Sequence, residues 1–137
     1  MSKTYNIFIS HSWAYSNYYD RITRLLDKRP YFSFNDYSIS KDNPVLCGLD
    51  RELNIAIYNR MRPCHVVLIL AGVYVTYRKW IKKEIRIAKN EFARAKPIIA
   101  IKPWANAKVS TVAYENADVL VNWNTESIID AIRIYGL

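Results

Sequence analysis

Hydrophobic residues recur along the chain in two alternating patterns. Short runs rich in β-branched and aromatic residues are typical of strands, and between them apolar residues recur three and four positions apart, which is typical of helices packed on one side. The runs predict strands at Tyr5–Ser10, Tyr31–Phe34, His65–Leu70, Pro97–Ile101 and Asp118–Val121.

Four apolar stripes predict the helices between and after these strands. Their members are Tyr18, Ile22, Leu25 and Leu26 before Pro30; Leu49, Leu53, Ala56 and Ile57; Ile81, Ile85, Ala88 and Phe92 in a helix from Thr76 to about Ala95; and Ile128, Ile129, Ile132 and Tyr135. Asn124 or Thr125 is expected as the N-cap of the last helix and Gly136 as its C-cap. The polar residues 35–44 predict a loop, and residues 102–117 fit either a degenerate helix or a loop.

Strands that alternate with helices through short connections favour an α/β domain with a parallel sheet. We expect one domain, residues 1–137, with a three-layer flavodoxin-like fold. Its five-stranded parallel sheet has the order 2-1-3-4-5, with helices on both faces. The length of 137 residues and the 51% hydrophobic share suit one core. No apolar stretch is long enough for a membrane span and no signal peptide is evident, so we expect a cytoplasmic protein.

The net charge of +8 is concentrated in one segment. Between Arg78 and Lys96, eight basic residues stand against Glu84 and Glu91, a balance of +6, and the remaining residues contribute only +2. One electropositive face is therefore expected, instead of a surface that is basic all round. Cys47 and Cys64 have no metal-ligand spacing, which favours reduced packing thiols over a disulfide and gives no support to a zinc site.

Ligands of open parallel sheets bind at the carboxyl ends of the strands, near the point where the strand order reverses. Ser10 and His11 follow the first strand there, and Asp36 and Tyr37 follow the second. No Gly-rich phosphate loop is present, and a hydrolase triad of Ser10, His11 and Asp36 lacks the required GxSxG elbow. His11 fits either a polar cap at the strand end or a general base.

Glu84 is the most informative residue of the third helix. At 100° per residue it lies on the edge of the apolar stripe, so we expect it to be half-buried and to face a pocket, with Trp80 one turn earlier on the same side. A sheltered carboxylate there would stabilise a positively charged transition state. Alternatively, Glu84 forms an ion pair with Arg78, Lys82 or Lys83 at helical spacing. Trp80 would then only pack in the core or at its rim.

Two segments together resemble the TIR domain superfamily. Tyr5–Ser12 is similar to its first signature box, a strand of the form (Y/D)-x-(V/I)-F-(I/L)-S that ends in Tyr or His. Val66–Leu70 with Tyr77–Ile85 is similar to the third strand and the next helix, which carries a Trp-x-x-x-Glu pattern. The chain most resembles bacterial and archaeal TIR-like proteins, including the TIR component of Thoeris anti-phage defence, although Ala71-Gly72 stands where many relatives carry Ser.

This resemblance implies cleavage of the nicotinamide–ribose bond of NAD⁺, followed by hydrolysis, cyclisation or transfer of ADP-ribose. It implies that NAD⁺ is a substrate, with no cofactor and no metal. The implied roles are a catalytic Glu84 with Trp80 as its helix partner, a pocket side formed by Phe8, Ser10 and His11, and Asp36 and Tyr37 in a loop that helps to cover the nucleotide. Assembly of several copies on activation and a downstream effector that senses the product are also implied, without a membrane partner.

Two other functions stay open at this point. A noncatalytic interaction module would use the basic third helix to dock an acidic partner or another copy of the chain. Nucleic-acid binding would rest on the local excess of +6 alone, and we do not expect nucleic acid as a partner.

Overall fold

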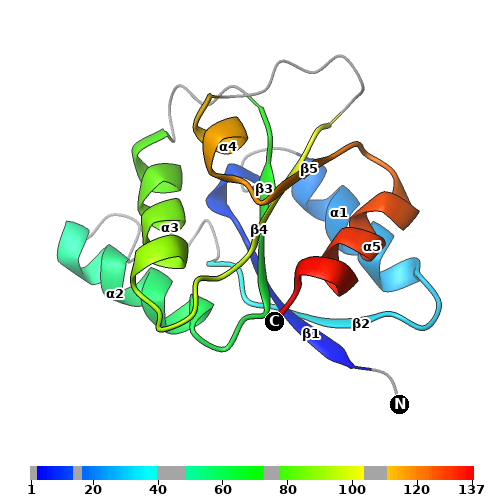
Figure 1. Ribbon diagram of the computed structural model, residues 1–137, viewed down its shortest axis with the longest axis horizontal. Coiled ribbons are helices and arrows are strands. Elements are labelled where there is room, and N and C mark those ends of the chain that lie inside the picture. Colours follow the sequence, from blue (N-terminus) through cyan, green and yellow to red (C-terminus); the bar gives the residue numbers. More distant parts are fainter. Residues whose placement is uncertain (1–2, 14–16, 40–48, 73–77, 104–110) are drawn as a thin grey trace.

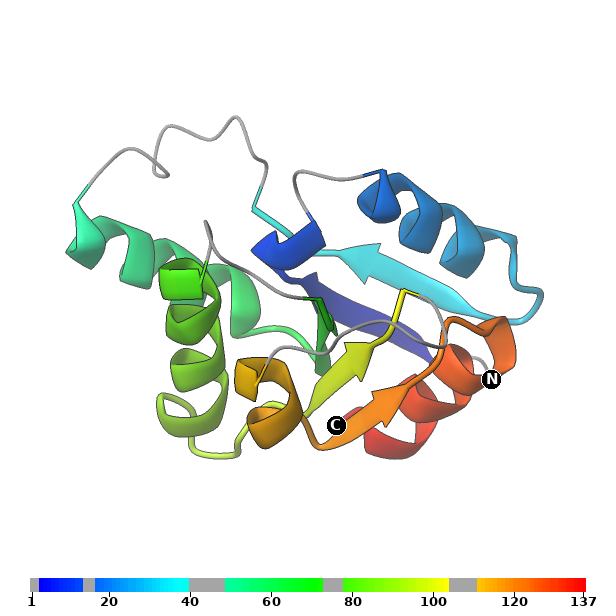
Figure 2. The same ribbon diagram turned by 90° about the horizontal axis from the view of Figure 1, so that it is seen from above.

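Five parallel strands form the centre of the molecule in the order β2-β1-β3-β4-β5, with helices on both faces (Figures 1 and 2). The computed structural model describes residues 3–13, 17–39, 49–72, 78–103 and 111–137. The strands are β1 (Thr4–Ile9), β2 (Ser33–Asp36), β3 (Val66–Leu70), β4 (Ile98–Ile101) and β5 (Val119–Val121). The helices are α1 (Tyr18–Lys28), α2 (Asp50–Met61), α3 (Arg78–Asn90), α4 (Thr111–Asn116) and α5 (Thr125–Tyr135), with a 3₁₀ turn, η1 (His11–Trp13), after β1. The predicted fold class and strand order are confirmed.

Alternate residues of the central strands serve two separate cores, because successive side chains of a strand point to opposite faces. The α1–α5 face is packed by Ile7 and Ile9 of β1 and Leu68 of β3 against both helices. The α2–α3–α4 face is packed by Phe8 of β1 and Val67 of β3. Every residue of β3 and of β4 is buried, as expected for strands covered on both sides.

The second strand lies two residues later than predicted. Tyr31 has a φ of 62° and is 89% exposed, a left-handed conformation that fits a turn and not a strand. Pairing with β1 therefore begins at Ser33, opposite Thr4. Asn35 and Asp36, which we expected in a loop, belong to the strand, and residues 40–44 of that loop lie outside the described ranges.

The helices agree with the predicted stripes except at their ends. Leu49 is 70% exposed because it precedes the first turn of α2, and Tyr135 is 39% exposed at the last residue of α5. Helix α3 ends at Asn90, so Phe92 lies beyond it and stacks on Tyr58, with ring centroids 4.8 Å apart. The predicted start of α3 at Thr76 falls outside the described residues.

The uncertain segment 102–117 contains a short helix, α4, whose Ala113 packs in the α2–α3–α4 core. Cys64 is a free, buried thiol, and burial raises its pKa to about 12, in agreement with a packing role. Cys47 is not among the described residues. None of the helices seen here has the length and apolar character needed to cross a bilayer.

Asn124 caps α5 as predicted: its side-chain oxygen accepts a hydrogen bond from the Ser127 amide at 3.0 Å. Asn124→Ala removes this acceptor, and the free energy of unfolding should fall by about 1 kcal/mol. Urea denaturation measures the change. Asn124→Asp is the control, because it retains an acceptor and adds a favourable negative charge at the helix start. Equal losses in both variants would contradict the capping role.

Candidate active site

The end of β1 is held firmly against the neighbouring strand. The Ser10 amide donates to the Leu68 carbonyl at 3.0 Å, and the Trp13 indole donates to the same carbonyl at 3.1 Å. Ser12 Oγ accepts from the Leu70 amide at 2.9 Å. Ser12 and Trp13 follow the predicted first strand together with Ser10 and His11, but their bonds to β3 could not be inferred from the sequence. These bonds fix the position of Ser10 and His11.

Glu84 of α3 meets this strand end directly. Ser10 Oγ donates to Glu84 Oε1 at 2.7 Å, and the His11 amide donates to Oε2 at 3.0 Å. Glu84 is only 1% exposed, so the expectation of a half-buried side chain was wrong. Around the helix axis the residue lies between Ile81 and Ile87, which are both buried, and the contact of α3 with η1 removes the remaining exposure.

The alternative, pairing of Glu84 with Arg78, Lys82 or Lys83, is not seen for the two lysines, whose side chains the structure describes. Lys83 lies 3.4 Å from Asp50, and Lys82 is exposed. The Arg78 side chain is outside the described part. The partners of Glu84 are therefore a hydroxyl and a backbone amide from a distant strand, and not cations of its own helix.

A stacked pair of rings lies beside the carboxyl group. The His11 imidazole and the Trp80 indole have centroids 3.8 Å apart and an interplanar angle of 8°. His11 is 5% exposed and Trp80 is half-buried. Ser10, His11, Trp80 and Glu84 thus form one cluster at the carboxyl end of β1.

Burial shifts the pKa values of the acid and of the imidazole in opposite directions. It raises the pKa of Glu84 from 4.5 to about 7, although the hydrogen bonds from Ser10 and His11 favour the ionised form and oppose the shift. It lowers the pKa of His11 from 6.5 to about 4. At neutral pH the imidazole is uncharged, and the carboxyl group is poised between its two protonation states.

Phe8, Asp36 and Tyr37 occupy different surroundings from this cluster. Phe8 is fully buried in the α2–α3–α4 core. The Asp36 carboxylate accepts hydrogen bonds from the Tyr19 hydroxyl of α1 and from the Ser38 amide, on the opposite face of the sheet from Glu84. Tyr37 points to the α2 side, where the Arg60 guanidinium lies 4.8 Å from its ring centroid.

Arg60 is a further residue that sequence reasoning missed. Its Nε donates to the Tyr37 carbonyl at 3.1 Å, and a terminal nitrogen lies 3.4 Å from the Asp36 carbonyl. It therefore ties the carboxyl end of β2 to α2. Nothing in the local sequence marks Arg60, because its partners are backbone carbonyls far away in the chain. Within the described ranges, no three His, Cys, Asp or Glu side chains converge as a metal site requires.

The raised pKa of Glu84 predicts a pH-dependent difference between the wild type and Glu84→Gln. A carboxyl pKa that is higher in the folded protein stabilises it below pH 4.5, and this contribution is lost as the pH rises through about 7. The neutral glutamine has no such loss. From pH 4.5 to 8 the variant should gain on the order of 3 kcal/mol relative to the wild type.

Denaturant unfolding of both proteins across this range measures the difference. His11 has the opposite effect, because its lowered pKa makes stability fall as the pH drops from 6.5 to about 4. The contribution of His11 is present in both the wild type and Glu84→Gln, so it cancels when the two free energies of unfolding are subtracted. A difference that stays constant with pH would show that Glu84 titrates normally.

Comparison with known families identifies the domain. The family described as "Thoeris protein ThsB, TIR-like domain" matches residues 8–108, which include the end of β1, the strands β2 to β4 and all of the cluster at Glu84. No curated protein matches the sequence significantly. The match covers well over half of the chain, and the observed sheet order agrees with a flavodoxin-like TIR fold. The chain therefore belongs to the Thoeris ThsB TIR-like domain family, whose setting is anti-phage defence.

Proposed function

We propose that the protein cleaves the nicotinamide–ribose bond of NAD⁺, with Glu84 as the catalytic residue. The observation that carries the proposal is the buried carboxyl group held by Ser10 and His11 at the carboxyl end of β1, where parallel sheets bind ligands. A carboxyl group placed there without a cationic partner is a common sign of function, because burial of such a group is unfavourable for stability. Membership of the TIR-like family supports the same reaction.

The proposed reaction begins with loss of nicotinamide. The C–N bond between ribose and the pyridinium ring breaks, its electron pair goes to the ring nitrogen, and nicotinamide leaves as a neutral molecule. The ribose is left with oxocarbenium character, and an ionised Glu84 nearby stabilises that positive charge. A water oxygen or a hydroxyl group of an acceptor then forms the new bond at the same carbon and loses its proton. The products are ADP-ribose or a cyclic or conjugated ADP-ribose.

Access to Glu84 requires a local opening of the site, since the side chain is only 1% exposed, and in the proposal the stacked His11 and Trp80 rings move to provide it. We propose that assembly of several copies shifts η1 or α3 and opens the site. The return of solvent would lower the pKa of Glu84 from about 7 towards its ordinary value, so opening also favours the ionised, catalytic form. Trp80, with its ring released, would pack against the substrate.

The other predicted residues act around this acid in the proposal. Phe8 supports the site from the core below, and Ser10 orients the carboxyl group through its hydroxyl. Tyr37 helps to cover the nucleotide from the end of β2, whereas Asp36 faces α1 and holds the strand end through Tyr19 and the Ser38 amide. In cells, the released product would act as a signal to a downstream effector in anti-phage defence, and the protein would work in the cytoplasm.

Glu84→Gln should abolish nicotinamide release from NAD⁺, because the amide cannot carry the negative charge that stabilises the ribosyl cation. The loss should be roughly a hundredfold or more, in line with the removal of a central electrostatic group. Chromatography with mass spectrometry measures nicotinamide and the ADP-ribose product, with the protein at high concentration to favour assembly. Glu91→Gln is the matched control: it lies just beyond the same helix, 3.9 Å from Arg86 on the surface. Undiminished release by Glu84→Gln would refute the proposal.

A second candidate function is docking of an acidic partner, or of another copy of the chain, onto the outer side of α3. A cavity of about 390 Å³ lies between α3 and α4, and its lining includes Lys82, Arg86 and Lys89. For this function, Lys82→Glu with Lys89→Glu should abolish association by electrostatic repulsion, and Glu84→Gln should leave it intact. Analytical ultracentrifugation and crosslinking distinguish the two results. Association that survives Lys82→Glu with Lys89→Glu would show that the outer side of α3 is not the docking surface.

A further inference from the structure

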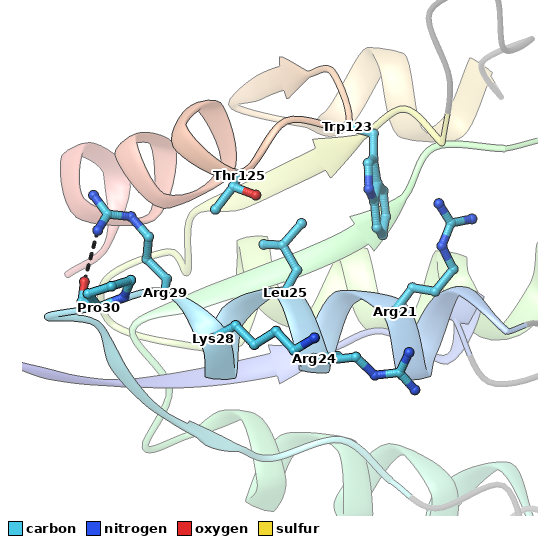
Figure 3. A pocket seen from close by; sticks show the side chains of 8 residues that line it. All are labelled: Arg21, Arg24, Leu25, Lys28, Arg29, Pro30, Trp123 and Thr125. Carbon is cyan, nitrogen blue, oxygen red and sulfur yellow. Dashed lines mark hydrogen bonds between the residues drawn. The ribbon is translucent and has the colours of Figure 1, made fainter.

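A basic groove lies on the opposite face of the sheet from Glu84, between α1 and the start of α5 (Figure 3). Its cavity of about 480 Å³ is in the size range of small-molecule sites. The lining residues are Arg21, Arg24, Leu25, Lys28, Arg29, Pro30, Trp123 and Thr125. Half of them are cationic, and none is acidic. The charge count along the sequence did not reveal this surface, because Asp20 and Asp27 lie in the same helix.

The cations follow one side of α1. Arg21, Arg24 and Lys28 recur three and four positions apart, which places them on a common helix face. The helical rise sets a span of roughly 12 Å from Arg21 to Arg29. Like charges at this spacing repel each other, and an anion in the groove would reduce that repulsion.

The two ends of the groove are held in place by the protein (Figure 3). At one end the Arg21 guanidinium lies 4.7 Å from the Tyr18 ring centroid and 5.0 Å from that of Trp123. At the other end Arg29 lies 2.9 Å from Glu126 Oε1 and donates to the Pro30 carbonyl at 2.9 Å. Cations that are already ordered lose little conformational entropy when they bind a ligand.

The middle of the groove carries charge without compensation. In the part of the chain that the structure describes, Arg24 and Lys28 make no ion pair and no hydrogen bond with the protein. Arg29 is neutralised by Glu126. Arg21 interacts with aromatic rings, which leave its charge in place. Arg21, Arg24 and Lys28 therefore offer three positive charges within about two helical turns.

We propose that this groove binds a linear chain of three or more linked phosphates, such as that of a nucleoside triphosphate. Such a chain carries at least three negative charges, which match the three available cations, and arginine and lysine are the usual ligands of phosphate. NAD⁺ has only two phosphates and a positive pyridinium ring, so it matches this groove poorly. The short basic stretch also favours a small ligand over a nucleic acid. The inference does not depend on NAD⁺ cleavage at Glu84, which lies across the sheet.

Isothermal titration calorimetry of the full chain with ATP, inorganic tripolyphosphate and NAD⁺ tests the proposal at moderate salt. ATP and tripolyphosphate should bind at least roughly tenfold more tightly than NAD⁺. Arg24→Ala with Lys28→Ala should weaken their binding roughly tenfold or more, because two charge-assisted contacts are lost. Arg51→Ala with Arg62→Ala is the matched control: both side chains are exposed in or next to α2, so the pair removes the same charge away from the groove and should leave the affinity nearly unchanged.

Comparison of ATP with tripolyphosphate shows whether the groove recognises the phosphates alone or a complete nucleotide. Equal affinities for ATP and tripolyphosphate would support recognition of the phosphates alone, and tighter binding of ATP would support a nucleotide whose base contacts Trp123. Absence of binding, or equal weakening in the two double variants, would overturn the proposal. A single-stranded oligonucleotide that binds more tightly than ATP, and loses affinity with Arg24→Ala and Lys28→Ala, would overturn it in favour of nucleic-acid binding.

Discussion

The contact between the Glu84 carboxyl group and the end of β1 is the constraint on which the candidate site depends. It joins α3 to the end of β1, an interior strand of the sheet, through the Ser10 hydroxyl and the His11 amide. Burial disfavours the charged acid, and the two hydrogen bonds only partly compensate, so its pKa lies near 7. If solvent reached the carboxyl group, its pKa would fall and the group would ionise at neutral pH. This property agrees with the proposal that the site is closed in the single chain and opens through a change of conformation.

The sheet separates two chemically different sides of the molecule. The α2–α3–α4 side holds the sheltered carboxyl group and its two stacked rings, and the α1–α5 side carries an open groove lined by cations. Alternation of side chains along β1 produces this separation, because Ile7 and Ile9 face one core and Phe8 and Ser10 face the other. Two sites can therefore occupy a small domain without sharing residues.

Most of the fold could be predicted from the sequence, since hydrophobic periodicity reports burial directly. The all-buried strand at Val66–Leu70 and the stripe of Ile81, Ile85 and Ala88 are clear examples. Prediction failed where one backbone angle or one end of an element decided the result, as at Tyr31 before β2 and Leu49 before α2. The position of Glu84 on the edge of its stripe was also predictable, but its full burial was not, because helical angles describe one helix without its neighbours.

The sequence by itself determined the family, the order of the elements, the faces that form the core, and the placement of Ser10, His11, Trp80 and Glu84 at one edge of the sheet. Local periodicity and short motifs contain that information. Only the tertiary structure decided which groups the acid bonds, that Asp36 faces the opposite side, and that cations of α1 form a groove with Trp123. These results depend on contacts between residues far apart in the chain. Distances, burial and local electrostatics arise from such contacts, and no pattern within a single segment encodes them.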